Sequence, residues 1–195
     1  MRFILITTLF FSSAASAGAY IGLNYGYSGY TSDALEKYKV SPKGATYGGF
    51  FGYGRNALGL EFIYQSLSAQ GPIKHDGEKQ TINQNATAMG GAVRLSFSSF
   101  YFRGGLASYQ LDQGVDISNA ASRATAEDVY DVRKKGARQS GSLFGVGIHT
   151  DWGSKILPKI LFVDFTRYQV GNVGYYDTFS VGISFLISDK HLRLK

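Results

Sequence analysis

Alternation between two kinds of side chain is the feature that most constrains this chain of 195 residues. Successive side chains of a β-strand point to opposite faces, so a strand with one apolar surface shows an apolar residue at every second position. From residue 19 to 30, Ile21, Leu23, Tyr25 and Tyr27 alternate with small or polar residues. A helix buries residues three and four apart instead, so this segment predicts a strand.

Seven further segments repeat the alternation. They cover residues 46–54, 58–66, 87–97, 100–110, 142–152, 160–169 and 178–187. The last is the clearest, with apolar side chains at every odd position from Phe179 to Ile187. Eight segments of about ten residues, each apolar on one parity and small or polar on the other, are typical of strands that cross a bilayer as a closed barrel.

The connections between these segments alternate in length. Long ones cover 31–43, 67–85 and 111–139, short ones lie at 55–56, 98–99 and 153–158, and the last, at 170–177, is of modest length. Outer-membrane barrels join their strands by short periplasmic turns and longer external loops. The sequence therefore predicts an all-β fold, an eight-stranded antiparallel up-and-down transmembrane barrel over residues 18–187, with a short helix within 120–132 of the third long loop.

Residues 1–17 have the pattern of a cleaved secretory signal peptide. Arg2 precedes an apolar run from Phe3 to Phe11, and Ala15 and Ala17 form a small-residue cleavage site. The apolar run is too short to span a bilayer as a helix. Since the chain has no cysteine, we expect neither a lipid anchor nor disulfides. The expected location is the bacterial outer membrane, and residues 188–195 are expected to form a short basic periplasmic tail.

The chain resembles the opacity-protein and OmpA-like eight-stranded outer-membrane barrels. The stretches that carry the resemblance are AYIGLNYGYS, GLEFIY, FYFRGGLASY and FSVGISFLI. The resemblance implies a barrel without enzymatic activity that meets outer-membrane lipid and lipopolysaccharide and is inserted by the barrel assembly machinery. Family members usually end on an aromatic residue of the last strand, whereas here SDKHLRLK follows Ile187.

The inward parity carries ionisable side chains of both signs, namely Glu61, Arg94, Arg103, His149, Asp151 and Asp164. The interior of an eight-stranded barrel is just wide enough for side chains to fill it. A buried charge without a partner costs several kcal/mol. We therefore expect a structural charge network of Glu61, Arg94, Arg103, His149 and Asp164; the alternative is that these charges gate a narrow ion path.

Catalytic, metal and cofactor sites find little support in the sequence. His149, Thr150 and Asp151 are the candidate for a catalytic group, but neighbouring residues of a strand point to opposite faces. His75 and His191 are far apart in sequence, and without cysteine a structural metal site is not expected. The glycine-rich strings lack the Lys-Ser/Thr pair of a phosphate loop, so no cofactor is expected. The net charge of +6 is scattered rather than arranged as a stripe, so nucleic acid is not an expected partner.

Four functional hypotheses follow. The first is a structural envelope protein whose external loops adhere to or interact with a partner. The second is a narrow pore or a transporter of small hydrophobic molecules. The third is a barrel enzyme that modifies lipid A, and the fourth is a soluble lipocalin-like carrier, which would have an apolar interior and a polar exterior.

Overall fold

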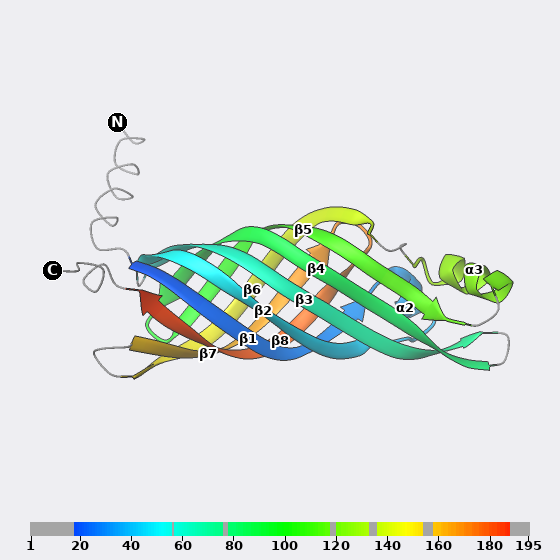
Figure 1. Cartoon of the computed structure of the whole chain (residues 1–195), viewed down its shortest axis with the longest axis horizontal. Helices are drawn as coiled ribbons and strands as arrows, with labels where there is room; N and C mark the ends of the chain where they lie inside the picture. Colours follow the sequence, from blue (N-terminus) through cyan, green and yellow to red (C-terminus); the bar gives the residue numbers. More distant parts are fainter. Residues whose placement is uncertain are drawn as a thin grey trace, which may run out of the picture.

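The computed structural model describes residues 18–55, 57–75, 78–117, 120–132, 136–153 and 158–187; the predicted signal peptide and C-terminal tail lie outside this range. Each strand pairs antiparallel with the next, and β8 pairs with β1 to close the barrel (Figure 1). The elements are β1 (Gly18–Thr31), α2 (Asp33–Lys37), β2 (Lys43–Arg55), β3 (Leu58–His75), β4 (Glu78–Phe97), β5 (Phe100–Asp116), α3 (Ala120–Val129), β6 (Arg138–Gly153), β7 (Pro158–Val170) and β8 (Gly174–Ile187). The predicted eight-stranded up-and-down barrel is confirmed.

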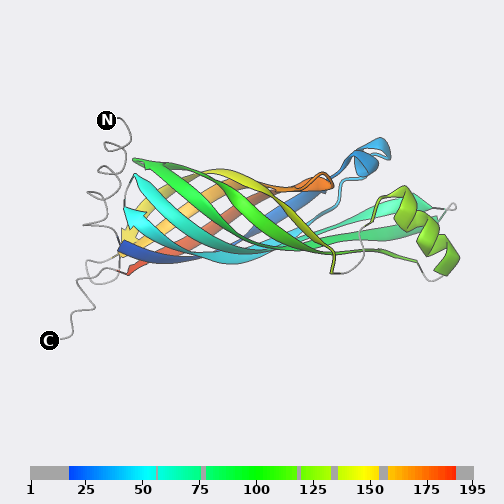
Figure 2. The same ribbon diagram turned by 90° about the horizontal axis from the view of Figure 1, so that it is seen from above.

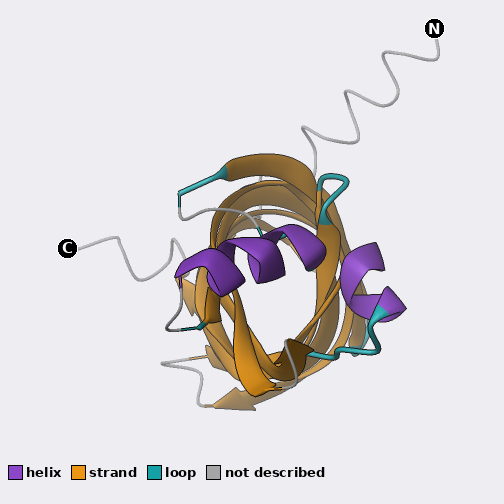
Figure 3. Cartoon of the chain, turned by 90° about the vertical axis from the view of Figure 1, so that its right-hand side faces the viewer, coloured by secondary structure: helices purple, strands orange, loops and turns teal. Residues whose placement is uncertain are grey.

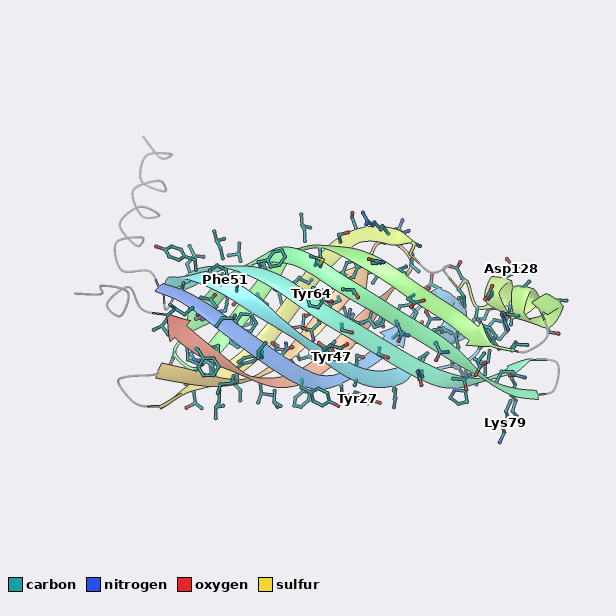
Figure 4. The ribbon with its side chains drawn as sticks, in the orientation of Figure 1. Tyr27, Tyr47, Phe51, Tyr64, Lys79 and Asp128 are labelled. Carbon is teal, nitrogen blue, oxygen red and sulfur yellow. The ribbon has the colours of Figure 1, made fainter. Side chains whose placement is uncertain are left out.

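An apolar belt surrounds the barrel. Large apolar side chains from all eight strands are exposed on it, including Leu23, Tyr27, Tyr47, Phe51, Leu60, Phe62, Tyr64, Met89, Phe102, Leu106, Phe144, Phe165 and Phe179 (Figure 4). From Met89 to Phe97 the belt follows nine residues of β4, about 26 Å of strand and about 20 Å along the barrel axis at a tilt of about 40°. This is close to the apolar band of about 25 Å that outer-membrane barrels present to lipid. No helix among the described residues is long and apolar enough to cross a membrane.

Three neighbouring strands continue well beyond the belt. Residues 67–75 of β3 pair in register with residues 78–86 of β4, and β4 pairs with β5 as far as Asp116. The sequence-based prediction of a loop at 67–85 is therefore wrong, and the loop predicted to begin at residue 111 begins later. These extensions form a three-stranded ribbon that projects past the rest of the barrel (Figure 2).

The two helices lie at the ribbon end of the molecule. α2 lies in the β1–β2 connection, where the Ser32 side chain accepts a hydrogen bond from the Leu35 amide at 3.4 Å and caps the helix. α3 follows β5 and confirms the short helix predicted within 120–132. Viewed along the barrel, α3 lies across the mouth and α2 lies at its side (Figure 3). We call the ribbon, α2 and α3 together the cap.

Candidate functional site

Four charged side chains that the sequence singled out meet inside the barrel. Arg94 Nη1 lies 3.4 Å from Glu61 Oε1, and Arg103 Nη1 lies 3.8 Å from Glu61 Oε2. Arg103 Nη2 forms a second ion pair, with Asp164 Oδ2. The side chains of Glu61, Arg103 and Asp164 are almost fully buried, and that of Arg94 is partly exposed. We call these four residues the lumen cluster.

Neutral donors complete the lumen cluster. Tyr20 donates a hydrogen bond to Glu61 Oε1 at 3.0 Å, and Tyr101 donates one to Asp164 Oδ2 at 2.9 Å. Ser180 donates to Asp164 Oδ1 at 2.8 Å. Each buried carboxylate therefore has an arginine and a hydroxyl as partners, which offsets part of its desolvation cost.

Arg103 also binds a hydroxyl, and Arg94 stacks on an aromatic ring. Arg103 Nη2 donates to Thr166 Oγ1 at 2.9 Å. The Arg94 guanidinium carbon lies 4.8 Å from the centre of the Tyr20 ring, a cation–π contact. Sequence reasoning missed the roles of Tyr20 and Thr166, although their inward parity was a usable signal.

Strand register explains why the lumen cluster contains acids from two different strands. Arg94 and Arg103 are directly opposite each other on β4 and β5, an arrangement that alone would be repulsive. Glu61 comes from β3, the neighbour of β4, and Asp164 comes from β7, two strands from β5. Glycine supplies the space for the guanidinium, because a Cβ at position 145 would lie 3.0 Å from Arg103 Nε.

His149 lies beside the lumen cluster. Its ring centre is 6.1 Å from that of Tyr101. With Glu61, Arg94 and Arg103 it lines a cavity of about 10 Å³, which is room for about one water molecule. Of the candidate catalytic group, Thr150 is exposed while His149 is half-buried, and the Asp151 side chain lies outside the described ones. Among the described residues, no group of three His, Cys, Asp or Glu could hold a metal ion.

Above the lumen cluster the interior is filled by neutral polar and aromatic side chains. Gln65 donates to Thr46 Oγ1 at 2.6 Å, and Tyr109 donates to the Ser142 carbonyl at 2.9 Å. Tyr109 and Tyr168 are fully buried. Large side chains therefore occupy the lumen between the lumen cluster and the cap.

The interior of the cap is largely apolar, although Gln84 and Gln113 of the ribbon are also buried. Its buried side chains come from α2, the ribbon and α3 and comprise Leu35, Ile73, Ile82, Val115, Ile117, Ala126 and Tyr130. Tyr130, which follows α3, contacts both the end of β3 and the connection between β1 and β2. Its hydroxyl donates to the Lys74 carbonyl at 3.2 Å, and its ring makes an edge contact with Tyr38 at 5.2 Å between centres. Burial, with Tyr38 contributing, raises the pKa of the Tyr130 phenol above its ordinary value. The cap is thus a single packed unit.

The outer face of the cap is polar. Ser66, Ser68 and Gln70 continue the outward parity of β3 above Tyr64. Near the tip, Lys74 and Lys79 are direct cross-strand partners and both are exposed. Like charges in this position repel each other unless an anion lies between them. Asp128 of α3 lies on the opposite side of the cap from Lys79 (Figure 4).

The comparisons with known proteins support the fold. A scan against protein-family models and a search of curated proteins each find no match. Among solved structures, the chain is similar to Ail, the attachment invasion locus protein of Yersinia pestis, solved in complex with the heparin analogue sucrose octasulfate. Ail is 10% identical with a TM-score of 0.50, over 88% of this chain and 99% of Ail.

Two further matches have lower scores. Neisserial surface protein A is 13% identical over 87% of this chain and 97% of its own, with a TM-score of 0.46. The N-terminal β-barrel domain of Pseudomonas aeruginosa OprF is 13% identical over 85% of this chain and 97% of its own, with a TM-score of 0.37. The strand pairing and the likeness to Ail carry the assignment: the chain has the fold of the eight-stranded outer-membrane barrels of the OmpA-like and opacity-like kind.

Proposed function

We propose that the protein is an outer-membrane barrel that holds a rigid binding surface outside the cell and contributes to envelope integrity. The observation that supports this most strongly is the cap, where two helices and a three-stranded ribbon pack around one apolar core. A preorganised surface loses little conformational entropy on binding, so it suits recognition better than mobile loops do. On this proposal the lumen cluster is structural, and the barrel is inserted by the assembly machinery into lipid and lipopolysaccharide.

The partner that we propose for the cap is an anionic polysaccharide. Lys74 and Lys79 form an exposed cationic pair on the ribbon, and Lys37 and Lys39 lie in the α2 connection. A sulfate or carboxylate between the two ribbon lysines would relieve their mutual repulsion. Ail shares the fold and was solved with a sulfated sugar, so heparin is a reasonable first probe.

Binding to immobilised heparin tests this partner. The folded barrel is expected to bind at about 0.15 M salt, where charges more than about 8 Å apart are largely screened. The double variant Lys74→Gln/Lys79→Gln is expected to elute at clearly lower salt. Arg138→Gln removes an exposed charge from β6 and serves as the control. No binding by the parent protein, or an equal shift in the control, would contradict the proposed partner.

Cell fractionation tests the proposed location. The mature chain should fractionate with the outer membrane, and its gel mobility should change on heating as a folded barrel unfolds. A soluble periplasmic chain would exclude this location. Planar-bilayer recordings test the pore alternative, since a lumen filled by side chains should pass little or no current.

A further inference from the structure

A shallow groove lies on the outer wall of the barrel, away from the cap and the lumen cluster. It has a volume of about 360 Å³, and its side chains are Tyr25, Tyr27, Ala45, Phe179 and Val181. These residues belong to the neighbouring strands β8, β1 and β2. All five are exposed and belong to the parity that faces outward. The groove is therefore open to the medium that surrounds the belt, which is lipid in a membrane-inserted barrel.

Small residues make the groove. Ala45 of β2 is directly opposite Tyr27 of β1, so a short side chain lies beside a long one on the outer wall. Gly26 and Gly44 also line it. At Gly26 the neighbouring strand is so close that a Cβ would lie 2.0 Å from the Phe179 carbonyl oxygen, which only glycine permits. The low part of the hollow is therefore formed by the short Ala45 side chain and by the residues Gly26 and Gly44.

The groove lies at the cap end of the apolar belt. Two residues beyond Ala45 on β2 is Lys43, and two residues beyond Tyr27 on β1 is Gly29, which is opposite Lys43. On β8 the next outward residue after Phe179 is Asp177. The apolar walls therefore end at a polar rim, at the depth where lipid headgroups begin, in the leaflet on the side of the cap.

Lys43 provides an available positive charge at this rim. Its side chain is exposed and forms no ion pair with another described residue. Asp177 is on β8, two strands away, and it already accepts two hydrogen bonds of 2.7 Å from Arg167. Gly29 of β1, which is opposite both residues, has no side chain, so none lies between Lys43 and Asp177 on that strand.

We infer that this groove holds an acyl chain of a phosphorylated glycolipid of the outer leaflet, with its phosphate on Lys43. The chain fits the apolar hollow, and the anionic headgroup complements the ammonium at the rim, where each such contact contributes to lipid affinity. Lipid A has both parts, and it belongs to the leaflet on the cap side. This inference depends on the proposed outer-membrane location but not on any partner of the cap.

Native mass spectrometry of the folded barrel in detergent, titrated with diphosphorylated lipid A, tests the site. Lys43→Gln should weaken lipid A binding about fivefold. Ala45→Trp should fill the groove and weaken binding about tenfold or more, because several methylene groups lose their contact. Phosphatidylethanolamine should bind more weakly than lipid A to the parent protein and should respond little to Lys43→Gln.

Two controls separate the groove from the general lipid surface. Leu106→Trp places the same large side chain on the β5 wall, and Lys79→Gln removes a lysine from the ribbon; neither should change lipid A binding. Equal losses in Ala45→Trp and Leu106→Trp, or phosphatidylglycerol binding as tightly as lipid A, would overturn the inference. If Ala45→Trp does not fold, as judged by gel mobility, Ala45→Leu replaces it. Heparin binding by the same samples reports on the cap separately, so failure of one does not imply failure of the other.

Discussion

The lumen cluster and the cap are two buried regions of the same molecule, and they differ in the chemistry of their side chains. In the lumen cluster, Glu61, Arg94, Arg103 and Asp164 are held by ion pairs and hydroxyl groups. In the cap, Ile73, Ile82 and Val115 are buried against helices without any charge. The same three strands supply residues to both regions, so strand identity does not explain the difference.

The medium outside the wall explains it. Along β3 the outward positions are Leu60, Phe62 and Tyr64 within the belt, and then Ser66, Ser68 and Gln70 above it. Where a strand faces lipid, apolar side chains on its outer face stabilise it. Its inner face can then hold polar groups that form hydrogen bonds with one another. Where the strand faces water, it is stabilised by burying its apolar side chains on the inner face. The apolar parity therefore changes face where β3 leaves the bilayer.

The largest effect is expected from breaking the lumen cluster. Arg103→Met leaves Glu61 with Arg94 and Tyr20 but leaves Asp164 without its arginine. An unpaired buried carboxylate should lower the free energy of unfolding by about 3–5 kcal/mol. Urea unfolding of the barrel in lipid vesicles measures this. Adding Asp164→Leu to this variant should recover part of the loss, because the orphaned charge is removed. An unchanged unfolding midpoint in Arg103→Met would show that charge pairing does not hold the lumen together.

A charge placed on the outer wall distinguishes the two media. Phe62→Lys puts an ammonium in the belt and should cost about 2–4 kcal/mol. Thr81→Lys puts the same group on the outer face of the ribbon, where a surface change should cost within about 0.5 kcal/mol. Urea unfolding of the barrel measures the cost of Phe62→Lys, and protease cleavage of the cap measures the cost of Thr81→Lys. Equal costs at the two sites would mean that the ribbon and the belt face the same medium.

Removing apolar volume from the cap should weaken the cap and leave the barrel intact. Ile82 is fully buried, and Ile82→Ala should cost about 2 kcal/mol, the lower end of the usual range, because a thin cap can partly collapse onto the space. Cleavage by protease added outside the cell should rise about thirtyfold, while the urea unfolding of the barrel should change little. If the variant lost both the protease resistance of the cap and the urea stability of the barrel, the cap and the barrel would unfold as one unit.

The smallest effect is expected where Tyr130 contacts the end of β3. Tyr130→Phe removes the hydrogen bond to the Lys74 carbonyl and should cost the cap about 1 kcal/mol, again read by protease cleavage. Because burial raises the pKa of the Tyr130 phenol, the neutral phenol stabilises the cap fully below about pH 10 and loses this effect as the pH rises further. Tyr130→Phe should abolish that alkaline dependence; a variant with the same dependence would assign it to another group.

The barrel could be predicted from sequence because the segments within the bilayer keep most of their large apolar side chains on one parity. The prediction failed where the alternation changed parity rather than ended. After Tyr64, the apolar residues move from even positions to odd ones, at Leu67, Ala69 and Ile73. A prediction that requires one constant apolar parity therefore ends the strand near Tyr64 and assigns the following residues to a loop. In the structure, β3 extends to His75.

The lumen cluster was only partly accessible from sequence. The inward parity identified Glu61, Arg94, Arg103 and Asp164 as residues of the interior, because an ionised side chain among small residues is conspicuous. Which side chains meet inside the lumen depends on barrel closure and register, so pairs such as Tyr101 with Asp164 require coordinates. The meeting of Tyr130 with Tyr38 and Lys74 depends in the same way on how separate connections fold together.

A nitroxide scan along β3 in lipid bilayers would examine the change of parity most directly. One label at a time replaces residues 58–74, and each is tested for collisions with oxygen, which concentrates in lipid, and with a water-soluble nickel complex. We predict oxygen contact at Leu60, Phe62 and Tyr64, nickel contact at Ser66, Ser68 and Gln70, and little contact with either at the odd positions throughout. Loss of the alternation beyond Ser66, or free nickel contact at Ile73, would contradict a strand that leaves the membrane and turns its apolar face inward.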